Sequence, residues 1–166
     1  MPKIPFDALP DSSRLWIFPS DRRLLPDEQD ALVRSVEAGL AAWSAHGSPV
    51  TWGVRVEQGQ CLMIGVDETR TALTGCSIDS AIARIRELET RFATSLLDNG
   101  RIFLREGDEI RGLSRPEFKK RVGEGTVTAE TLVFDNTIVT VGAFRRGAWE
   151  IPFHRSWHRE AFPIQS

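Results

Sequence analysis

The sequence lacks the features that mark several classes of protein. It has no tyrosine, and its two cysteines, Cys61 and Cys76, are too few for a disulfide framework and do not form a CxxC pair. No apolar run approaches the roughly 18 residues of a membrane span, and residues 1–10 lack the basic and then apolar pattern of a signal peptide. With 21 basic and 23 acidic residues, the chain has no basic excess of the kind that nucleic-acid binding needs. We therefore expect a cytoplasmic protein with reduced thiols that binds neither nucleic acid nor membrane.

Catalytic and cofactor motifs are also missing. There is no GxxxxGK[ST] phosphate loop, GxSxG elbow, HExxH pair or GxGxxG turn, so P-loop nucleotide hydrolysis has no site. His154 and His158 are four residues apart, but Pro152 precedes them and no second ligand pair at metal spacing follows. We therefore predict no P-loop ATPase, no cofactor and no metal ion, and the sequence leaves open whether the two histidines bind a metal.

What is present is an ordinary globular composition over 166 residues, with 41% hydrophobic and 27% charged residues. Alternating and helical periodicities predict six elements in the order β-α-β-β-α-β. They are strand 14–19, helix 26–46, strands 50–57 and 61–66 joined at 58–60, helix 77–92 and strand 101–106. This order is that of a ferredoxin-like unit, an antiparallel sheet with two helices on one face. We thus predict an α+β fold, with a tail at 1–13 and a ferredoxin-like core at 14–107.

The remaining residues, 108–166, predict a small β-rich extension packed on that core. Ser114 and Glu117 have the spacing of a capping box, and Gly123 would end the short helix that they open. Extended segments are expected at 109–113, 132–134, 138–141 and 148–153.

The five tryptophans fall into two groups. Trp16, Trp43 and Trp52 lie in periodic apolar segments and are expected in the core. Trp149 and Trp157 lie in a polar C-terminal stretch, which favours contact with a ligand or partner, although core packing is the commoner role for any tryptophan.

Polar residues scattered along the sequence would converge at one pole of a ferredoxin-like unit. His46 would close the first helix, Asp67 and Glu68 would close the third strand, and residues 75–79 (Gly-Cys-Ser-Ile-Asp) would open the second helix. A helix N-terminus stabilises anions and thiolates. Cys76 is thus a candidate nucleophile or redox thiol, His46 its base or ion partner, and Asp67 the orienting acid.

Each member of this pole also has a simpler structural explanation. His46 would complement the helix dipole as a C-terminal cation. Asp67 and Glu68 would be solvated loop acids, and Cys76 a small buried residue. The remaining candidates for ligand contact at the pole are Gly75, which would permit a tight entry, Ser77, which would cap the helix, and Asp79, which would complement its dipole.

Several short stretches carry a family resemblance that covers nearly the whole chain. They are WSAHGSPV (43–50), VDE (66–68), GCSID (75–79), VFDN (133–136), WEIP (149–152) and SWH (156–158). With these the chain resembles a family of uncharacterised bacterial proteins of about this length, whose members often carry the label "ABC transporter ATPase". The resemblance implies a bacterial cytosolic protein and brings no established activity. The label conflicts with the missing phosphate loop.

The sequence supports two functions of different kinds. The first is a binding or regulatory module that holds a small anion, a metabolite or a protein at the pole, with Trp157 and His158 as further contact residues. The second is a thiol-dependent enzyme in which Cys76 reacts. We favour the binding module, because no catalytic constellation matches a known signature.

Overall fold

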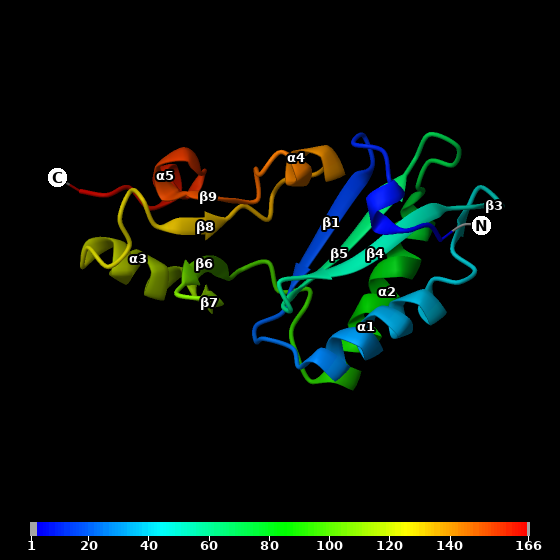
Figure 1. Ribbon diagram of the computed structural model, residues 1–166, viewed down its shortest axis with the longest axis horizontal. Coiled ribbons are helices and arrows are strands. Elements are labelled where there is room, and N and C mark those ends of the chain that lie inside the picture. The colour runs from blue at the N-terminus through cyan, green and yellow to red at the C-terminus, as the bar shows by residue number, and fades with distance from the viewer. Residues whose placement is uncertain (1–2, 166) are drawn as a thin grey trace. The chain divides into compact units, whose positions relative to one another are not determined.

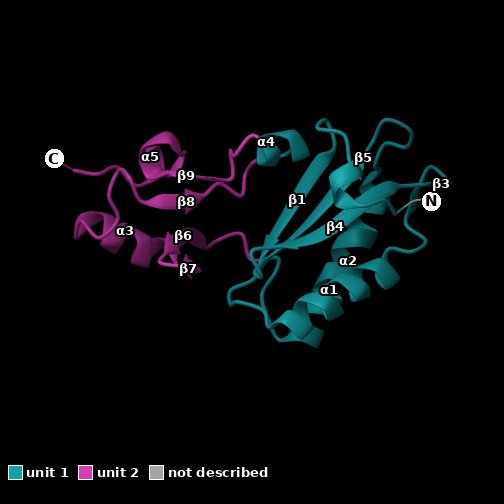
Figure 2. Cartoon of the chain, viewed as in Figure 1, with its two compact units in different colours: residues 1–97, 139–145 teal, residues 98–138, 146–166 magenta. Residues whose placement is uncertain are grey.

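The structure, a computed structural model, describes residues 3–165 and is an α+β fold (Figure 1). The chain forms two compact units (Figure 2). Unit 1 contains residues 1–97 and 139–145, and unit 2 contains residues 98–138 and 146–166. The chain therefore passes between the units three times, whereas we expected a single boundary after residue 107.

Unit 1 is built on a three-stranded antiparallel sheet with the strand order β1-β5-β4. The strands are β1 (Arg14–Pro19), β4 (Thr51–Glu57) and β5 (Cys61–Asp67). Thr51 pairs with Asp67, and Arg14 pairs with Val66, so both neighbours of β5 begin where β5 ends. The predicted strand at 14–19 and the predicted hairpin around residues 58–60 are confirmed.

Two helices, α1 (Pro26–Gly39) and α2 (Gly75–Phe92), pack on one face of this sheet (Figure 1). Side chains of a strand alternate between faces, so every second residue of β5 points to the helices. The resulting core is mainly aliphatic, and its fully buried members include Leu62, Ile64 and Val66 of β5, Leu32 and Val36 of α1, and Ala81 and Ile85 of α2.

The other face of the sheet is covered by the N-terminal segment and by α4 (Val141–Arg145). A Cβ atom added to Gly65 would lie 2.4 Å from the Leu9 side chain and 3.1 Å from that of Val141, so a larger residue there would displace the Leu9 side chain. Arg145 donates hydrogen bonds to the Leu9 carbonyl at 2.7 Å and to Asp11 Oδ1 at 2.7 Å. It also reaches the carbonyl groups of residues 6 and 7. This one side chain therefore joins α4 to the segment that contains η1 (Phe6–Ala8).

The expected fourth strand of this sheet, residues 101–106, lies elsewhere. Strand β6 (Ile102–Glu106) pairs with β7 (Glu109–Leu113) in unit 2, because a tight turn at Gly107-Asp108 gives it a local partner. The free edge of β1 is instead met by residues 139–140. Arg14 bridges Thr140 in antiparallel fashion, and the Leu15 N–H donates to the Val139 carbonyl at 2.9 Å.

The first helix ends at Gly39 and not at residue 46 as predicted. The next residues form a small hairpin in which β2 (Ser44–Ala45) pairs with β3 (Ser48–Pro49). His46 and Gly47 have φ angles of 54° and 74°, and two positive φ values are what a two-residue type I′ turn requires. Trp43 has helical spacing from α1, but its indole N–H donates to the Ser77 carbonyl at 2.8 Å. This contact with α2 draws residues 40–46 away from a helical path.

Unit 2 contains a four-stranded sheet with the order β7-β6-β8-β9. Its further elements are β8 (Leu132–Phe134), β9 (Glu150–Pro152), α3 (Arg115–Gly123), η2 (Phe153–Arg155) and α5 (His158–Ala161). The predicted cap of α3 is confirmed, since the Glu117 N–H donates to Ser114 Oγ at 3.2 Å. The predicted strand at 138–141 is wrong, because α4 begins at Val141 and belongs to unit 1.

Candidate functional site

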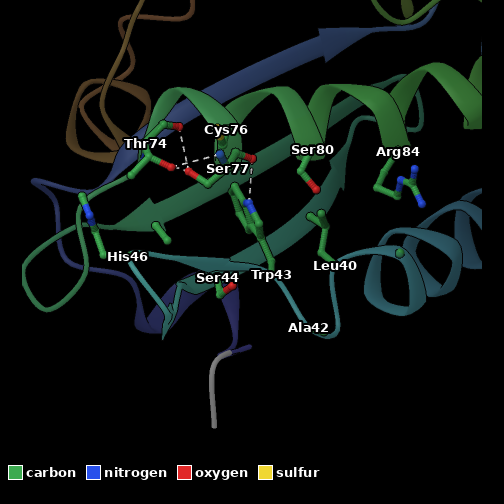
Figure 3. Close-up of a pocket in the computed structure, with 12 residues that line it drawn as sticks. Leu40, Ala42, Trp43, Ser44, His46, Thr74, Cys76, Ser77, Ser80 and Arg84 are labelled. Carbon is green, nitrogen blue, oxygen red and sulfur yellow. Dashed lines mark hydrogen bonds between the residues drawn. The ribbon is translucent and has the colours of Figure 1, made fainter.

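Unit 1 has a pocket of about 350 Å³ where α1 ends and α2 begins (Figure 3). This volume is within the range of sites that hold small molecules. The pocket is lined by Gly39, Leu40, Ala42, Trp43, Ser44, Ala45, His46, Thr74, Cys76, Ser77, Ser80 and Arg84. Three of the predicted site residues, His46, Cys76 and Ser77, are thus brought to one cavity.

The N-terminus of α2 is held by a reciprocal capping box between Thr74 and Ser77 (Figure 3). The Ser77 N–H donates to Thr74 Oγ1 at 3.1 Å, and the Thr74 N–H donates to Ser77 Oγ at 2.7 Å. The helix therefore begins at Gly75, and Ser77 is its third residue and not the N-cap that we predicted. Cys76, the second residue, is exposed. Its backbone N–H is one of the four that an α-helix cannot satisfy internally.

Trp43 forms the buried wall of the pocket. It is 5% exposed, and its hydrogen bond to the Ser77 carbonyl joins the loop after α1 to the first turn of α2. Its ring also packs against Trp16 and Trp52, at centroid distances of 5.7 and 6.4 Å. The predicted core role of these three tryptophans fits this packing, and the same packing fixes the hairpin that carries His46. The His46 side chain at the hairpin tip is exposed.

Cys76, Ser80 and Arg84 follow one another at intervals of four residues and therefore share one face of α2. In Figure 3, Ser80 is directed from α2 toward Leu40. Arg84 packs across the end of α1, since a Cβ atom added to Gly39 would lie 3.6 Å from its side chain. Ser80 and Arg84 were not among the predicted site residues, although their spacing from Cys76 is a signal that could have found them.

The charge of the pocket has one sign. None of its twelve lining residues is aspartate or glutamate, while Arg84 is a permanent cation and His46 becomes one when it is protonated. The first turn of α2 adds the positive end of a helix dipole. The lining therefore favours a ligand that carries negative charge.

The predicted acids at the end of β5 do not line this pocket. Asp67 Oδ1 accepts the backbone N–H of Thr69 at 3.0 Å and its hydroxyl at 2.7 Å. Glu68 accepts Arg14 Nε at 2.7 Å and the Leu73 N–H at 2.9 Å. Partial burial raises the pKa of Glu68, but the bonds from Leu73 and Arg14 outweigh it and leave this pKa below its ordinary value. Both carboxylates thus order the loop before α2.

Gly75 and Asp79 lie in the first turns of α2 and are exposed, and neither lines the pocket. Their expected contact with a ligand therefore stays a prediction. A Cβ atom added to Gly75 would meet nothing within 4 Å, so the residue is not required by a close approach of the chain.

The two C-terminal candidates, Trp157 and His158, belong to unit 2. His158 is 1% exposed, and its Nδ1 is hydrogen-bonded to Ser156 Oγ. Its ring stacks on that of Trp157 at a centroid distance of 3.9 Å. Burial is the main cause that lowers the pKa of His158 to about 4; nearby Asp135 opposes this and Arg115 adds to it. His158 is therefore a neutral core residue above this pH.

Trp149 also lies in the core of unit 2. It is 3% exposed, packs against the Phe134 ring at a centroid distance of 4.7 Å and an interplanar angle of 57°, and donates its indole N–H to Asn136 Oδ1 at 2.8 Å. The structure therefore gives Trp149 a packing role, which was the alternative to ligand contact.

Residues 3–165 show neither a cluster of metal-binding side chains nor a membrane-spanning helix. Within this range, no group of three or more histidine, cysteine, aspartate or glutamate side chains has the arrangement of a metal site. In the same range, no helix combines the length and the apolar character needed to cross a bilayer.

Comparison with known proteins gave no match to a protein-family model, and no significant similarity to a curated protein or a solved structure. The family resemblance described above therefore stays a prediction.

Proposed function

We propose that this protein is a binding module that holds a small anionic molecule in the pocket between α2 and the loop after α1. The observation that carries this proposal is the lining itself. It combines Arg84, His46 and several hydroxyl groups with no carboxylate, in a cavity of about 350 Å³. A concave site with an apolar wall and a few polar groups on one side is typical of small-molecule recognition.

We further propose that unit 1 is a variant of the ferredoxin-like fold. The order β1-β5-β4 matches three strands of that arrangement, and residues 139–140 lie at the edge of β1 where the fourth strand would be. In such a unit, the end of the first helix, the end of the third strand and the start of the second helix meet at one pole. Because ferredoxin-like units serve many functions, this supports the position of the site and not the identity of its ligand.

A direct test is NMR titration of ¹⁵N-labelled protein with benzoate, adipate and inorganic phosphate. We expect at least one of these anions to shift the backbone signals of Cys76 and Ser80 and the indole N–H of Trp43. Hexane-1,6-diamine, a cation of similar length to adipate, is expected to shift none of them, because Arg84 would repel it.

Two tryptophan substitutions on α2 provide the matched control. Ser80→Trp places a large ring in the pocket and is expected to abolish the shifts, whereas Thr90→Trp changes an exposed position outside the pocket lining and is expected to preserve them. If Ser80→Trp unfolds the protein, Arg84→Gln replaces it as the blocking variant. Equal responses to adipate and to the diamine, or shifts that survive both pocket variants, would overturn the proposal.

A second candidate function, thiol chemistry at Cys76, is supported by the contrast between the two cysteines. Cys76 is exposed and lines the pocket, while Cys61 is 0% exposed. A thiol at a helix N-terminus and near a protonated histidine gains reactivity. We expect iodoacetamide to alkylate Cys76 faster than N-acetylcysteine at neutral pH, and His46→Gln to slow the reaction. A rate equal to that of N-acetylcysteine at every pH would exclude the thiol enzyme and leave the binding module.

A further inference from the structure

We infer that the ligand of this pocket is an elongated dianion, with one anionic group held by Arg84 and the other near His46 and the first turn of α2. This inference rests on the proposed binding function and adds the class of ligand. It follows from where the cationic and polar groups lie along the pocket, and from Glu87, an acid that competes for Arg84.

The polar groups are spread along the pocket and are not gathered at one point. Cys76 and Arg84 are eight positions apart on α2, which corresponds to about 12 Å along the helix axis. Helical side chains lean toward the N-terminus, so the long Arg84 side chain shortens this separation. Because the polar groups are still spread along α2, a compact anion cannot contact both ends of the pocket, whereas a linear molecule with a charged group at each end can.

The part of the pocket between these two ends suits the uncharged middle of such a molecule. Ser80 lies halfway along the same face of α2, and Leu40, Ala42 and Trp43 supply apolar surface. A short hydrocarbon chain would contact the apolar side chains, and the Ser80 hydroxyl would donate a hydrogen bond to a hydroxyl or carbonyl substituent. The lining contains no acid that would oppose a negative charge at either end.

Arg84 has a competing partner, Glu87, outside the pocket lining. Its Nη2 lies 3.0 Å from Glu87 Oε1, and both side chains are largely exposed, at 44% and 64%. Exposed ion pairs of this kind are weak. Arg84 can therefore exchange Glu87 for a ligand carboxylate, and Glu87 limits the affinity of that end.

The test compares succinate, adipate and suberate, each with the matching ω-hydroxy acid, by isothermal titration calorimetry. In the unmodified protein we expect one of the longer diacids to bind about tenfold more tightly than its hydroxy acid, since a charge-assisted bond is added at the second end. Succinate is too short to reach both ends, so we expect it to bind like its hydroxy acid.

Two substitutions then locate the second contact. Arg84→Gln is expected to bring the ratio between diacid and hydroxy acid to about one, because the second anionic group loses its partner. Glu87→Gln is expected to strengthen diacid binding about twofold by freeing Arg84. Melting curves of both variants check that they fold, and because both positions are exposed, we expect little change.

The outcomes separate this inference from the proposed function. If diacids and hydroxy acids bind equally at every length, or if Arg84→Gln leaves the ratio unchanged, the dianion inference is wrong while the anion-binding module stands. If neither series binds and the NMR titration with benzoate, adipate and phosphate is also silent, both are wrong.

Discussion

The two units differ in what they bury. The main core of unit 1 is made of aliphatic residues and tryptophans with a single phenylalanine, Phe18, and its buried polar residues, such as Ser20, Gln60 and Thr94, carry no charge at any pH. The core of unit 2 is rich in phenylalanine and includes His158 beside Ser156. His158 is the one buried histidine, since His46 and His154 are both exposed. The stability of the two cores should therefore respond differently to cavity formation, to low pH and to polar substitution.

The largest expected effect comes from Phe118→Ala in unit 2. Phe118 is 0% exposed and packs against the rings of Phe153, His158 and Phe162, at centroid distances of 6.1, 5.9 and 5.0 Å. Loss of its ring should lower the free energy of unfolding of unit 2 by about 3–5 kcal/mol. Hydrogen exchange read by mass spectrometry should show faster exchange in unit 2 and unchanged protection in α2.

The matched control for this substitution is Leu132→Ala, at a strand position that is 37% exposed, which should change protection little. Equal loss of protection in both units after Phe118→Ala would mean that they unfold as one, and the comparison would then fail.

The second effect is the loss of stability of unit 2 in acid. Burial keeps His158 neutral and lowers its pKa from 6.5 to about 4, so the unfolded chain binds a proton more readily than the folded one. The stability that unit 2 has above pH 6.5 should therefore fall as the pH drops from 6.5 to 4, by up to about 3 kcal/mol, and then level off. Denaturant unfolding at a series of pH values measures this.

His158→Phe should remove this pH dependence, because phenylalanine does not titrate, whereas His154→Gln at an exposed position should leave it unchanged. A pH profile of unit 2 that is the same in the unmodified protein and in His158→Phe would assign the acid sensitivity to other groups.

The smallest expected effect is the difference in stability between serine variants of the two cysteines of unit 1. Cys61 is fully buried in β5, so Cys61→Ser would replace a weakly polar thiol with a hydroxyl that loses more hydration on burial, and it should cost about 1–3 kcal/mol. Cys76 is exposed, so Cys76→Ser should change stability by less than about 0.5 kcal/mol. Melting curves of the two variants decide this. A larger loss for Cys76→Ser would make Cys76 a packing residue and remove it from the site.

The sequence predicted the fold best where an apolar pattern extends over many residues. The nearly continuous apolar run in residues 61–66 and the helical spacing of Ile78, Ile82 and Ile85 predicted β5 and α2 closely. Prediction from the sequence failed where a tertiary contact determines the path of the backbone. The apolar spacing of Trp43 continues that of α1, but its hydrogen bond to Ser77 ends the helix early. Strand partners cannot be read from alternation either, which is why β6 was assigned to the wrong sheet.

The candidate site was predicted only in part, because local sequence patterns do not show tertiary contacts. Local motifs located Cys76 and Ser77 at the start of α2, and the pocket includes His46 although it lies on a hairpin and not at a helix end. Asp67 and Glu68 bind their own loop, and no local pattern distinguishes an acid that orders a loop from one that meets a ligand. Arg84 was missed because it lies two turns beyond the motif.

The position of Arg145 has a consequence for how the protein is made. On the ribosome, the N-terminal segment emerges first, yet the guanidinium group that holds the Leu9 carbonyl is 136 residues further along. Residues 98–138 of unit 2 must be synthesised in between, so the nascent chain carries Phe6, Leu9 and the edge of β1 without their final cover until residues 139–145 follow. An uncovered strand edge is prone to pair with other chains. A ribosome that stalls before residue 139 would therefore release a product more prone to aggregation than one that stops just after Arg145.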